Sequence, residues 1–230
     1  MLIGFLMPKS LYERVNTKLF FDKLALTTAK YSFKRMLKKV SKDDWQYLLP
    51  FLACSICFVA TDLFGLIEKS RLAYWSGGLL VEPYRIVTTH FIHGDAKHLL
   101  ANIFGIVVAR YCLKGLRLKG NFFFLLLVAF LIPLQTLIFW LVDIFFFRNL
   151  MSFAVGFSGI IYGVDAFILL ASIYGKQRFA GLDIQLKKDK QIRQTMVVLT
   201  SIGIAWSLLP GISLLGHLAG FSAGALLFLL

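Results

Sequence analysis

The sequence is organised around a serine that lies between glycines near the start of a long apolar segment, in the stretch Gly156-Phe157-Ser158-Gly159-Ile160-Ile161-Tyr162-Gly163. Gly159 and Gly163 form a small-xxx-small pair, a pattern that lets helix backbones approach closely in lipid. A serine in a membrane helix commonly donates a hydrogen bond to a carbonyl group one turn earlier. The same hydroxyl group becomes a nucleophile when a general base lies beside it. The function therefore depends on which side chains the rest of the sequence brings to Ser158.

The composition predicts a membrane protein. The chain has 230 residues, 58% of them hydrophobic, and a mean hydropathy of +0.75, which is well above the range of soluble domains. The net charge of +13 does not indicate nucleic-acid binding, because the basic residues cluster between apolar segments rather than along one face with interleaved aromatic residues. No disulfide framework is expected, because the cysteines lie in or at the ends of apolar stretches: Cys54, Cys57 and Cys112.

Six apolar segments predict an all-α membrane protein with a bundle of six transmembrane helices. A helix needs about 20 residues to cross about 30 Å of hydrocarbon. The predicted spans are residues 48–66, 97–113, 121–142, 152–174, 195–209 and 213–230. They leave no room for a second folded domain. We therefore expect a basic cytoplasmic or interfacial leader over residues 1–46 and one six-helix domain over residues 47–230.

The charges of the connecting loops predict the orientation of the helices. The leader and the loops after the second and fourth spans are strongly basic, whereas the other three loops carry few or balanced charges. Lysine and arginine are retained on the cytoplasmic side of a membrane, so both termini are expected in the cytoplasm. The expected location is a bacterial inner (plasma) membrane, and an organelle presequence within the leader remains open as an alternative.

This topology places four polar residues at one depth. His98 and Asn102 lie at the start of the second span, Ser158 about six residues into the fourth, and His217 about four or five residues into the sixth. At about 1.5 Å per residue, all four lie within roughly 10 Å of the outer surface. A second ridge of small residues around His217 predicts close packing of the sixth span on the fourth: Gly216, Gly220 and Gly224.

These residues predict acyl-transfer chemistry. A neutral histidine accepts the proton of a serine hydroxyl group and later donates it to the leaving amine. The tetrahedral oxyanion needs preorganised donors, for which His98, Asn102 and the backbone N–H of Ser158 are the candidates. Tyr162, one turn after Ser158, is expected to hold the imidazole ring of His217. Because no carboxylate lies at this depth on a companion helix, a dyad is expected rather than a triad.

The motifs resemble those of the rhomboid family of intramembrane serine proteases over roughly residues 82–230. The resemblance is carried by residues 84–93 followed by 98–102, by 156–159, and by 217–220 with Gly224. It implies a rhomboid-like bundle in which Ser158 is the nucleophile and His217 is the base. His98 and Asn102 would stabilise the oxyanion, and Tyr162 and Gly156 would support the site.

The resemblance also implies the reaction and the partners. The family cleaves transmembrane or membrane-adjacent segments of membrane proteins through an acyl-enzyme. The expected partners are therefore transmembrane protein substrates and the lipid bilayer, and no nucleic acid. No metal ion or organic cofactor is required. Regulated proteolysis is the biological process that such an activity implies.

The same residues allow three other interpretations: a pseudoprotease, a transporter and a zinc site. A rhomboid-like pseudoprotease would bind membrane clients without cleaving them, and a small transporter would use intramembrane polar residues such as Asp165. A buried, hydrogen-bonded acid is the simpler interpretation of Asp165. His90 and His93 are not expected to bind zinc, because the sequence has no His-Glu-x-x-His motif and no cysteine among these histidines.

Overall fold

The computed structural model is mostly helical. Within the residues that it describes, 42–120, 122–209 and 211–230, six helices exceed ten residues: α4 (Trp45–Phe58), α7 (Ala96–Gly115), α8 (Phe123–Phe145), α9 (Ser158–Tyr174), α10 (Lys190–Trp206) and α11 (Leu214–Leu229). A π-helical segment, η2 (Val59–Leu63), extends α4, and η1 (Lys42–Asp44) precedes it. Most of the expected leader, residues 1–41, lies outside the described residues.

Short elements connect these helices. The connection between α4 and α7 contains α5 (Lys69–Leu72), β1 (Tyr74–Trp75) and α6 (Arg85–Thr88). Strand β2 (Phe153–Ala154) pairs antiparallel with β1, and β3 (Lys176–Phe179) forms a hairpin with β4 (Leu182–Leu186). The expectation of an all-α protein thus holds for the long elements, but two small two-stranded sheets are added among the described residues.

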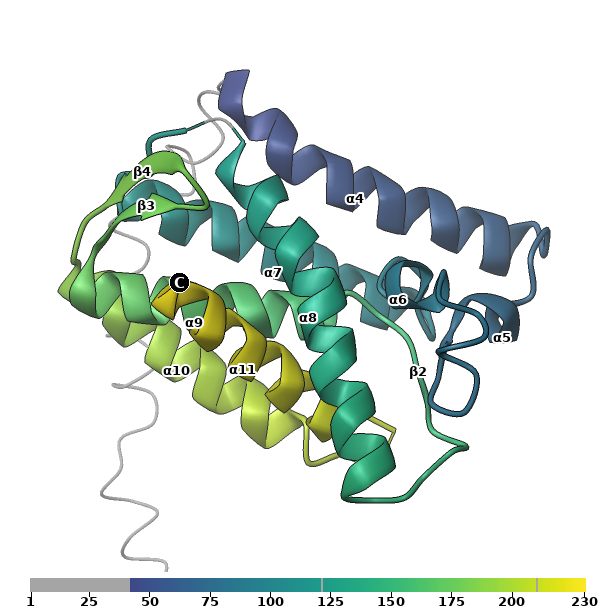
Figure 1. Cartoon of the computed structure of the whole chain (residues 1–230). Coiled ribbons are helices and arrows are strands. Elements are labelled where there is room, and N and C mark those ends of the chain that lie inside the picture. Colours follow the sequence, from purple (N-terminus) through teal and green to yellow (C-terminus); the bar gives the residue numbers. More distant parts are fainter. Residues whose placement is uncertain (1–41, 121, 210) are drawn as a thin grey trace, which may run out of the picture. The chain divides into compact units, whose positions relative to one another are not determined.

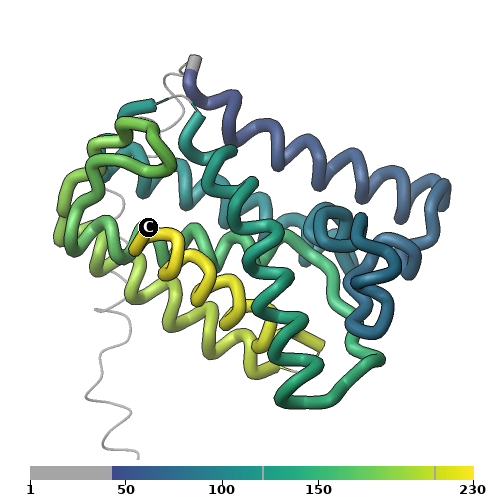
Figure 2. Tube along the Cα trace, in the orientation of Figure 1, coloured from purple at the N-terminus to yellow at the C-terminus, as the bar shows by residue number. Residues whose placement is uncertain are grey.

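Helix α9 is the central element of the fold. It packs against α7, α8, α10 and α11, and Figure 1 shows α10 and the yellow α11 running beside it. The trace in Figure 2 places the connection that contains α5 and α6 at one end of the helices and the β3–β4 hairpin at the other. A residue on α9 therefore has neighbours from four other helices.

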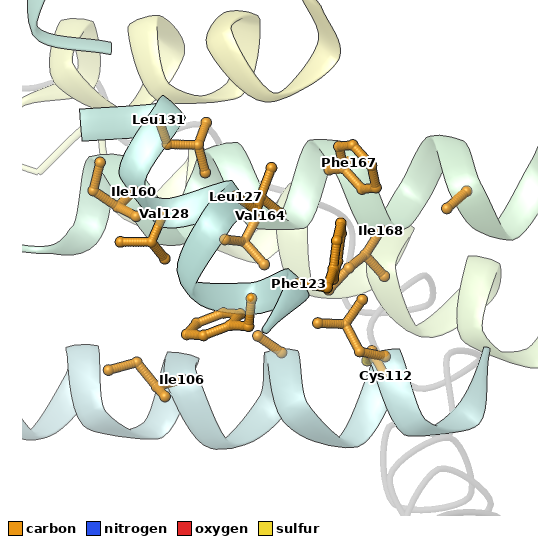
Figure 3. Packing of buried hydrophobic residues seen from close by; sticks show 14 of the residues in the cluster. Ile106, Cys112, Phe123, Leu127, Val128, Leu131, Ile160, Val164, Phe167 and Ile168 are labelled. Atoms are coloured by element: carbon orange, nitrogen blue, oxygen red, sulfur yellow. The ribbon is translucent and has the colours of Figure 1, made fainter. Parts of the chain in front are cut away.

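Apolar side chains of α7, α8 and α9 form the buried core (Figure 3). Ile106 and Cys112 of α7 face residues of α8 and α9 across this layer. Many of its members have almost no exposed surface: Leu113, Phe123, Leu127, Leu131, Ile160, Phe167 and Ile168. Close packing of these side chains, at the density of a protein interior, holds the three helices in a fixed register.

The outer faces of the helices are also apolar. Among the described residues, three helices are long and apolar enough to cross a membrane: Trp45–Leu63, Ala96–Gly115 and Phe123–Phe145. Two shorter helices, Ser158–Tyr174 and Leu214–Leu229, are apolar as well. Large apolar side chains are exposed along α4, α7 and α8, including Leu48, Ile56, Leu100, Phe104, Phe130 and Leu137. Such a surface suits lipid rather than water.

The start of α9 differs from the sequence-based expectation. We expected Ser158 about six residues into a helix that began at residue 152, but Ser158 is the first helical residue. Residues 153 and 154 are instead extended and pair with residues 75 and 74. The apolar residues before Ser158 pack as a strand, and Gly156 then turns the chain with a φ of +117°, a conformation that glycine adopts without strain.

Helices α9 and α11 touch backbone to backbone. A Cβ atom on Gly220 would overlap the carbonyl oxygen of Gly159, and one on Gly224 would overlap that of Gly163. A Cβ atom on Gly163 would in turn lie 2.9 Å from the carbonyl oxygen of Gly220. The two glycine ridges that the sequence shows therefore face each other, as the small-xxx-small pattern predicts.

We predict that Gly220→Ala destabilises the protein. Alanine gains up to about 1 kcal/mol of helix propensity over glycine, but the new methyl group meets the backbone of α9, and overpacking of this kind costs about 1–3 kcal/mol. The midpoint of thermal unfolding in detergent should fall. Ser222→Thr adds one carbon atom at an exposed position of the same helix and should leave the midpoint unchanged. An equal midpoint for both variants would contradict the tight contact.

Arg85 holds the long connection before α7 together. Its side chain is 6% exposed. Its Nη1 atom donates to the carbonyl oxygens of Ser70 at 2.7 Å and Ala73 at 2.6 Å, and its Nε atom donates to Glu82. The guanidinium also lies over the ring of Trp75, with its Cζ atom 5.9 Å from the ring centroid. One planar cation thus joins segments that are far apart along the connection.

Arg85→Lys should therefore lower stability despite preserving the charge. Lysine lacks the forked donors, so at least one buried carbonyl group loses its partner, at about 1–3 kcal/mol. The free energy of unfolding in a detergent–denaturant titration measures this loss. Arg71→Lys is the matched control, because the Arg71 side chain is 78% exposed and only loosely paired with Glu68. A loss equal to that control would show that Arg85 acts only through its charge.

Candidate active site

The backbone before α9 presents Ser158 at a helix N-terminus. The N–H of Gly156 donates to the carbonyl oxygen of Thr89 at 2.9 Å, and the Thr89 hydroxyl group donates to the carbonyl oxygen of Ala154 at 2.8 Å. These bonds fix the turn that leads into α9. The first N–H groups of a helix have no partner within the helix, and its N-terminus carries a partial positive charge. Ser158 is therefore placed where developing negative charge is stabilised.

Ser158 and His217 are in direct contact. The Oγ atom of Ser158, from the start of α9, lies 2.8 Å from the Nε2 atom of His217. His217 is the fourth residue of α11 and is 8% exposed. The Ser213 hydroxyl group accepts from the N–H of Gly216 and caps this helix. The structure thus brings together the two residues that the sequence predicts as nucleophile and base.

An aromatic ring and a second hydroxyl group hold the imidazole. The ring of Tyr162 stacks on that of His217, with a centroid distance of 4.3 Å and an interplanar angle of 12°. On the other edge of the imidazole, the Oγ atom of Ser207 lies 2.6 Å from Nδ1. Sequence reasoning expected Tyr162 near the base but missed Ser207. The available signal was a polar residue ten positions before His217, at the end of the preceding apolar segment.

His98 and Asn102 lie on α7 beside Gly156. The N-cap residue Asp95 accepts from the N–H of His98 at 2.8 Å and so fixes the start of this helix. A Cβ atom on Gly156 would lie 2.6 Å from the Nε2 atom of His98 and 3.6 Å from the Nδ2 atom of Asn102. The absence of a side chain at position 156 leaves room for both donors next to the turn.

The amide nitrogen of Asn102 is unsatisfied. Asn102 is 3% exposed, and its Nδ2 atom has no hydrogen-bond partner in the described part of the chain. A buried donor without an acceptor costs about 1–3 kcal/mol, so such groups are rare in folded proteins. The arrangement suits a donor that receives its acceptor from a bound molecule.

A cavity of about 30 Å³ opens beside Ser158. This volume is large enough for one or two water molecules. Its wall includes both members of the Ser158–His217 pair and polar side chains of α8 and the loop before α7: Gln135, Thr136, Thr89 and His90. Water or a small side chain therefore has direct access to the hydroxyl–imidazole contact.

His90 and His93 lie near the site but are not part of the Ser158–His217 contact. The Nε2 atom of His90 is 2.9 Å from the Thr136 hydroxyl group, and burial lowers the pKa of His90 to about 4. Burial, helped by the neighbouring His98 ring, lowers the pKa of His93 to about 4 as well. Both rings are therefore neutral at pH 7. His93 meets His98 edge to face, with ring centroids 5.2 Å apart.

Asp165 is half-buried in the middle of α9, two turns beyond Ser158. Within the described residues, no hydrogen bond joins its carboxyl group to Ser158 or His217. The carboxyl group that the transporter interpretation uses is therefore separate from the hydroxyl–imidazole cluster.

A known protein family matches most of the chain. A model of the Rhomboid domain matches residues 81–230, well over half of the chain. No curated protein gave a match. The family generally consists of serine proteases that act on membrane proteins within the bilayer, and some of its members are inactive. With its apolar helices, this chain is an integral membrane protein and belongs to the rhomboid family.

Proposed function

We propose that this rhomboid protein is an intramembrane serine endopeptidase that cleaves transmembrane or membrane-adjacent segments of membrane proteins. The observation that carries the proposal is the 2.8 Å contact between Ser158 Oγ and His217 Nε2. A serine at this distance from a neutral imidazole is the arrangement that activates a hydroxyl group for attack on a carbonyl carbon. The catalytic residues would be Ser158 and His217.

The proposed reaction needs only these two side chains for proton transfer. As Ser158 Oγ bonds to the carbonyl carbon of the scissile peptide, His217 Nε2 takes its proton. When the tetrahedral intermediate collapses, the C–N bond breaks and the imidazolium gives that proton to the departing amine. A water molecule then attacks the acyl-enzyme and gives a proton to His217 Nε2. The imidazolium returns that proton to Ser158 Oγ as the ester bond breaks. The cavity beside Ser158 offers space for that water.

The oxyanion of the intermediate would be stabilised by Asn102, His98 and the backbone N–H of Ser158. The unpaired Nδ2 atom of Asn102 and the proximity of His98 Nε2 to Gly156 support this role. The positive end of α9 adds to it. Gly156 would keep the space open, and Tyr162 would hold the base by stacking.

We further propose a six-span topology with both termini in the cytoplasm. The helices α9, α10 and α11 have 17, 17 and 16 residues, or about 25 Å each, and the extended residues before α9 add length on the outer side. The basic character of the α9–α10 connection supports a cytoplasmic position for it. Residues 1–46 would form a basic leader and residues 47–230 the protease domain. The proposed location is a bacterial inner membrane.

Covalent labelling tests the nucleophile. A fluorophosphonate should label the protein in detergent, and Ser158→Ala and His217→Ala should abolish both this labelling and the cleavage of a co-expressed model transmembrane substrate. Ser222→Ala, at an exposed position of α11, should behave like the unchanged protein. Absence of both labelling and cleavage in the unchanged protein would contradict the protease proposal. Full substrate processing by Ser158→Ala would indicate a client-binding protein without its own catalysis.

Asn102→Ala should lower kcat by about 10²–10³-fold while leaving KM nearly unchanged. The reason is that a donor aimed at the oxyanion acts on the transition state and not on the bound ground state. Steady-state kinetics with a fluorogenic transmembrane peptide in detergent measure the split. Asn149→Ala, in the exposed loop after α8, is the control. If Asn102→Ala mainly raises KM, its role is substrate binding rather than oxyanion stabilisation.

A further inference from the structure

The proposed reaction leaves one contact of the base unexplained. The Nδ1 atom of His217 lies 2.6 Å from the Oγ atom of Ser207. Ser207 follows the last residue of α10 and is 2% exposed. A buried polar contact of this length is a hydrogen bond, so either the hydroxyl group or the imidazole supplies the proton. Which group donates decides whether Nε2 is free to accept the proton of Ser158.

The other contacts of Ser207 answer this question. Its Oγ atom lies 2.7 Å from the carbonyl oxygen of Gly203. A carbonyl oxygen only accepts, so the single hydroxyl hydrogen of Ser207 is used in that bond. The Tyr162 hydroxyl group lies 3.3 Å from the same Oγ atom. With its own hydrogen committed to Gly203, Ser207 accepts from Tyr162 and, with its other lone pair, from His217.

The proton must then be on Nδ1 of His217. In a neutral imidazole one nitrogen donates and the other accepts. With Nδ1–H donating to Ser207, Nε2 carries the lone pair that faces Ser158. In the opposite tautomer Nδ1 carries no proton, so Ser207 would have to release the carbonyl oxygen of Gly203 and donate to Nδ1 instead. If Ser207 kept its bond to Gly203, the 2.6 Å contact would hold no proton at all.

We propose that Ser207 is a positioning residue that selects the base-competent tautomer of His217. Ser207 accepts the Nδ1–H bond before the reaction and keeps accepting it when His217 becomes an imidazolium ion. The same bond fixes the ring plane that Tyr162 stacks upon. This inference rests on the proposed function, since selecting a tautomer matters only if His217 takes the proton of Ser158.

Gly203 makes the arrangement sterically feasible. A Cβ atom at position 203 would overlap the Tyr162 hydroxyl group and lie 3.0 Å from its Cζ atom. Without a side chain there, Tyr162 reaches Ser207 while its ring stays on the imidazole. The end of α10 therefore supplies the carbonyl group, the space and the hydroxyl group that act on the base.

Kinetics give the first part of the test. Ser207→Ala should reduce kcat about 10–100-fold, by analogy with the loss seen when the partner that orients a metal-ligating histidine is removed, with KM nearly unchanged. Ser207→Thr keeps the hydroxyl group and should restore most of kcat. Ser201→Ala, at an exposed position of α10, is the matched control. An unchanged kcat in Ser207→Ala, or failure of Ser207→Thr to exceed it, would overturn the proposal.

NMR of the imidazole nitrogens gives a readout that does not depend on activity. The protein has four histidines, so ¹⁵N-histidine labelling with His217→Asn as the assignment reference resolves the ring of His217. We expect a protonated Nδ1 and an unprotonated Nε2, and a mixture of both tautomers in Ser207→Ala. Protonated Nε2 in the unchanged protein, or no change in the variant, would overturn the inference. Absence of both fluorophosphonate labelling and substrate cleavage, alongside a protonated Nδ1, would instead overturn the proposed function and leave the tautomer selection standing.

Discussion

The close approach of α9 and α11 is the constraint on which the site depends. Serine and histidine side chains are short, so a 2.8 Å contact between Ser158 and His217 requires their helix backbones to be neighbours. The glycine ridges meet this need, because a Cβ atom at Gly220 would overlap the carbonyl oxygen of Gly159. In a bilayer, no hydrophobic drive favours helix contacts over lipid contacts. Close packing of glycine backbones therefore fixes both the association of the helices and the relative height of the two side chains.

The surroundings of this contact show how a polar site is maintained within an apolar protein. Buried polar groups are stable only when their hydrogen bonds are satisfied, and the hydroxyl groups of Ser207 and Thr89 follow this rule. The Nδ2 atom of Asn102 does not. This unsatisfied donor lies beside Gly156, whose own N–H is bonded to the carbonyl oxygen of Thr89. The group that awaits an acceptor is therefore distinct from the groups that hold the framework.

The sequence was sufficient to predict the long helices and the meeting of α9 with α11, because apolar length and glycine spacing are local patterns with one physical meaning in a membrane. It could not predict where α9 begins, since residues 152–157 are as apolar as the helix that follows and their extended form depends on pairing with β1. The β3–β4 hairpin was not predicted either, because a basic loop shows little hydrophobic periodicity. Ser207 was missed because its contact with His217 exists only after the chain reverses between α10 and α11.

A hydroxyl group suits the proposed orienting role at this position better than a carboxylate does. Ser207 is 2% exposed, and a carboxylate there would have to lose its hydration beside a base that is neutral before the reaction, a penalty of several kcal/mol. A neutral hydroxyl group avoids that penalty but stabilises the imidazolium ion less. A hydroxyl group can also either donate to Nδ1 of His217 or accept from it, so the tautomer is decided only when another acceptor binds the hydroxyl hydrogen. The carbonyl group of Gly203, 2.7 Å away, is that acceptor. A backbone group and a hydroxyl group together thus select the tautomer that a carboxylate would otherwise select alone.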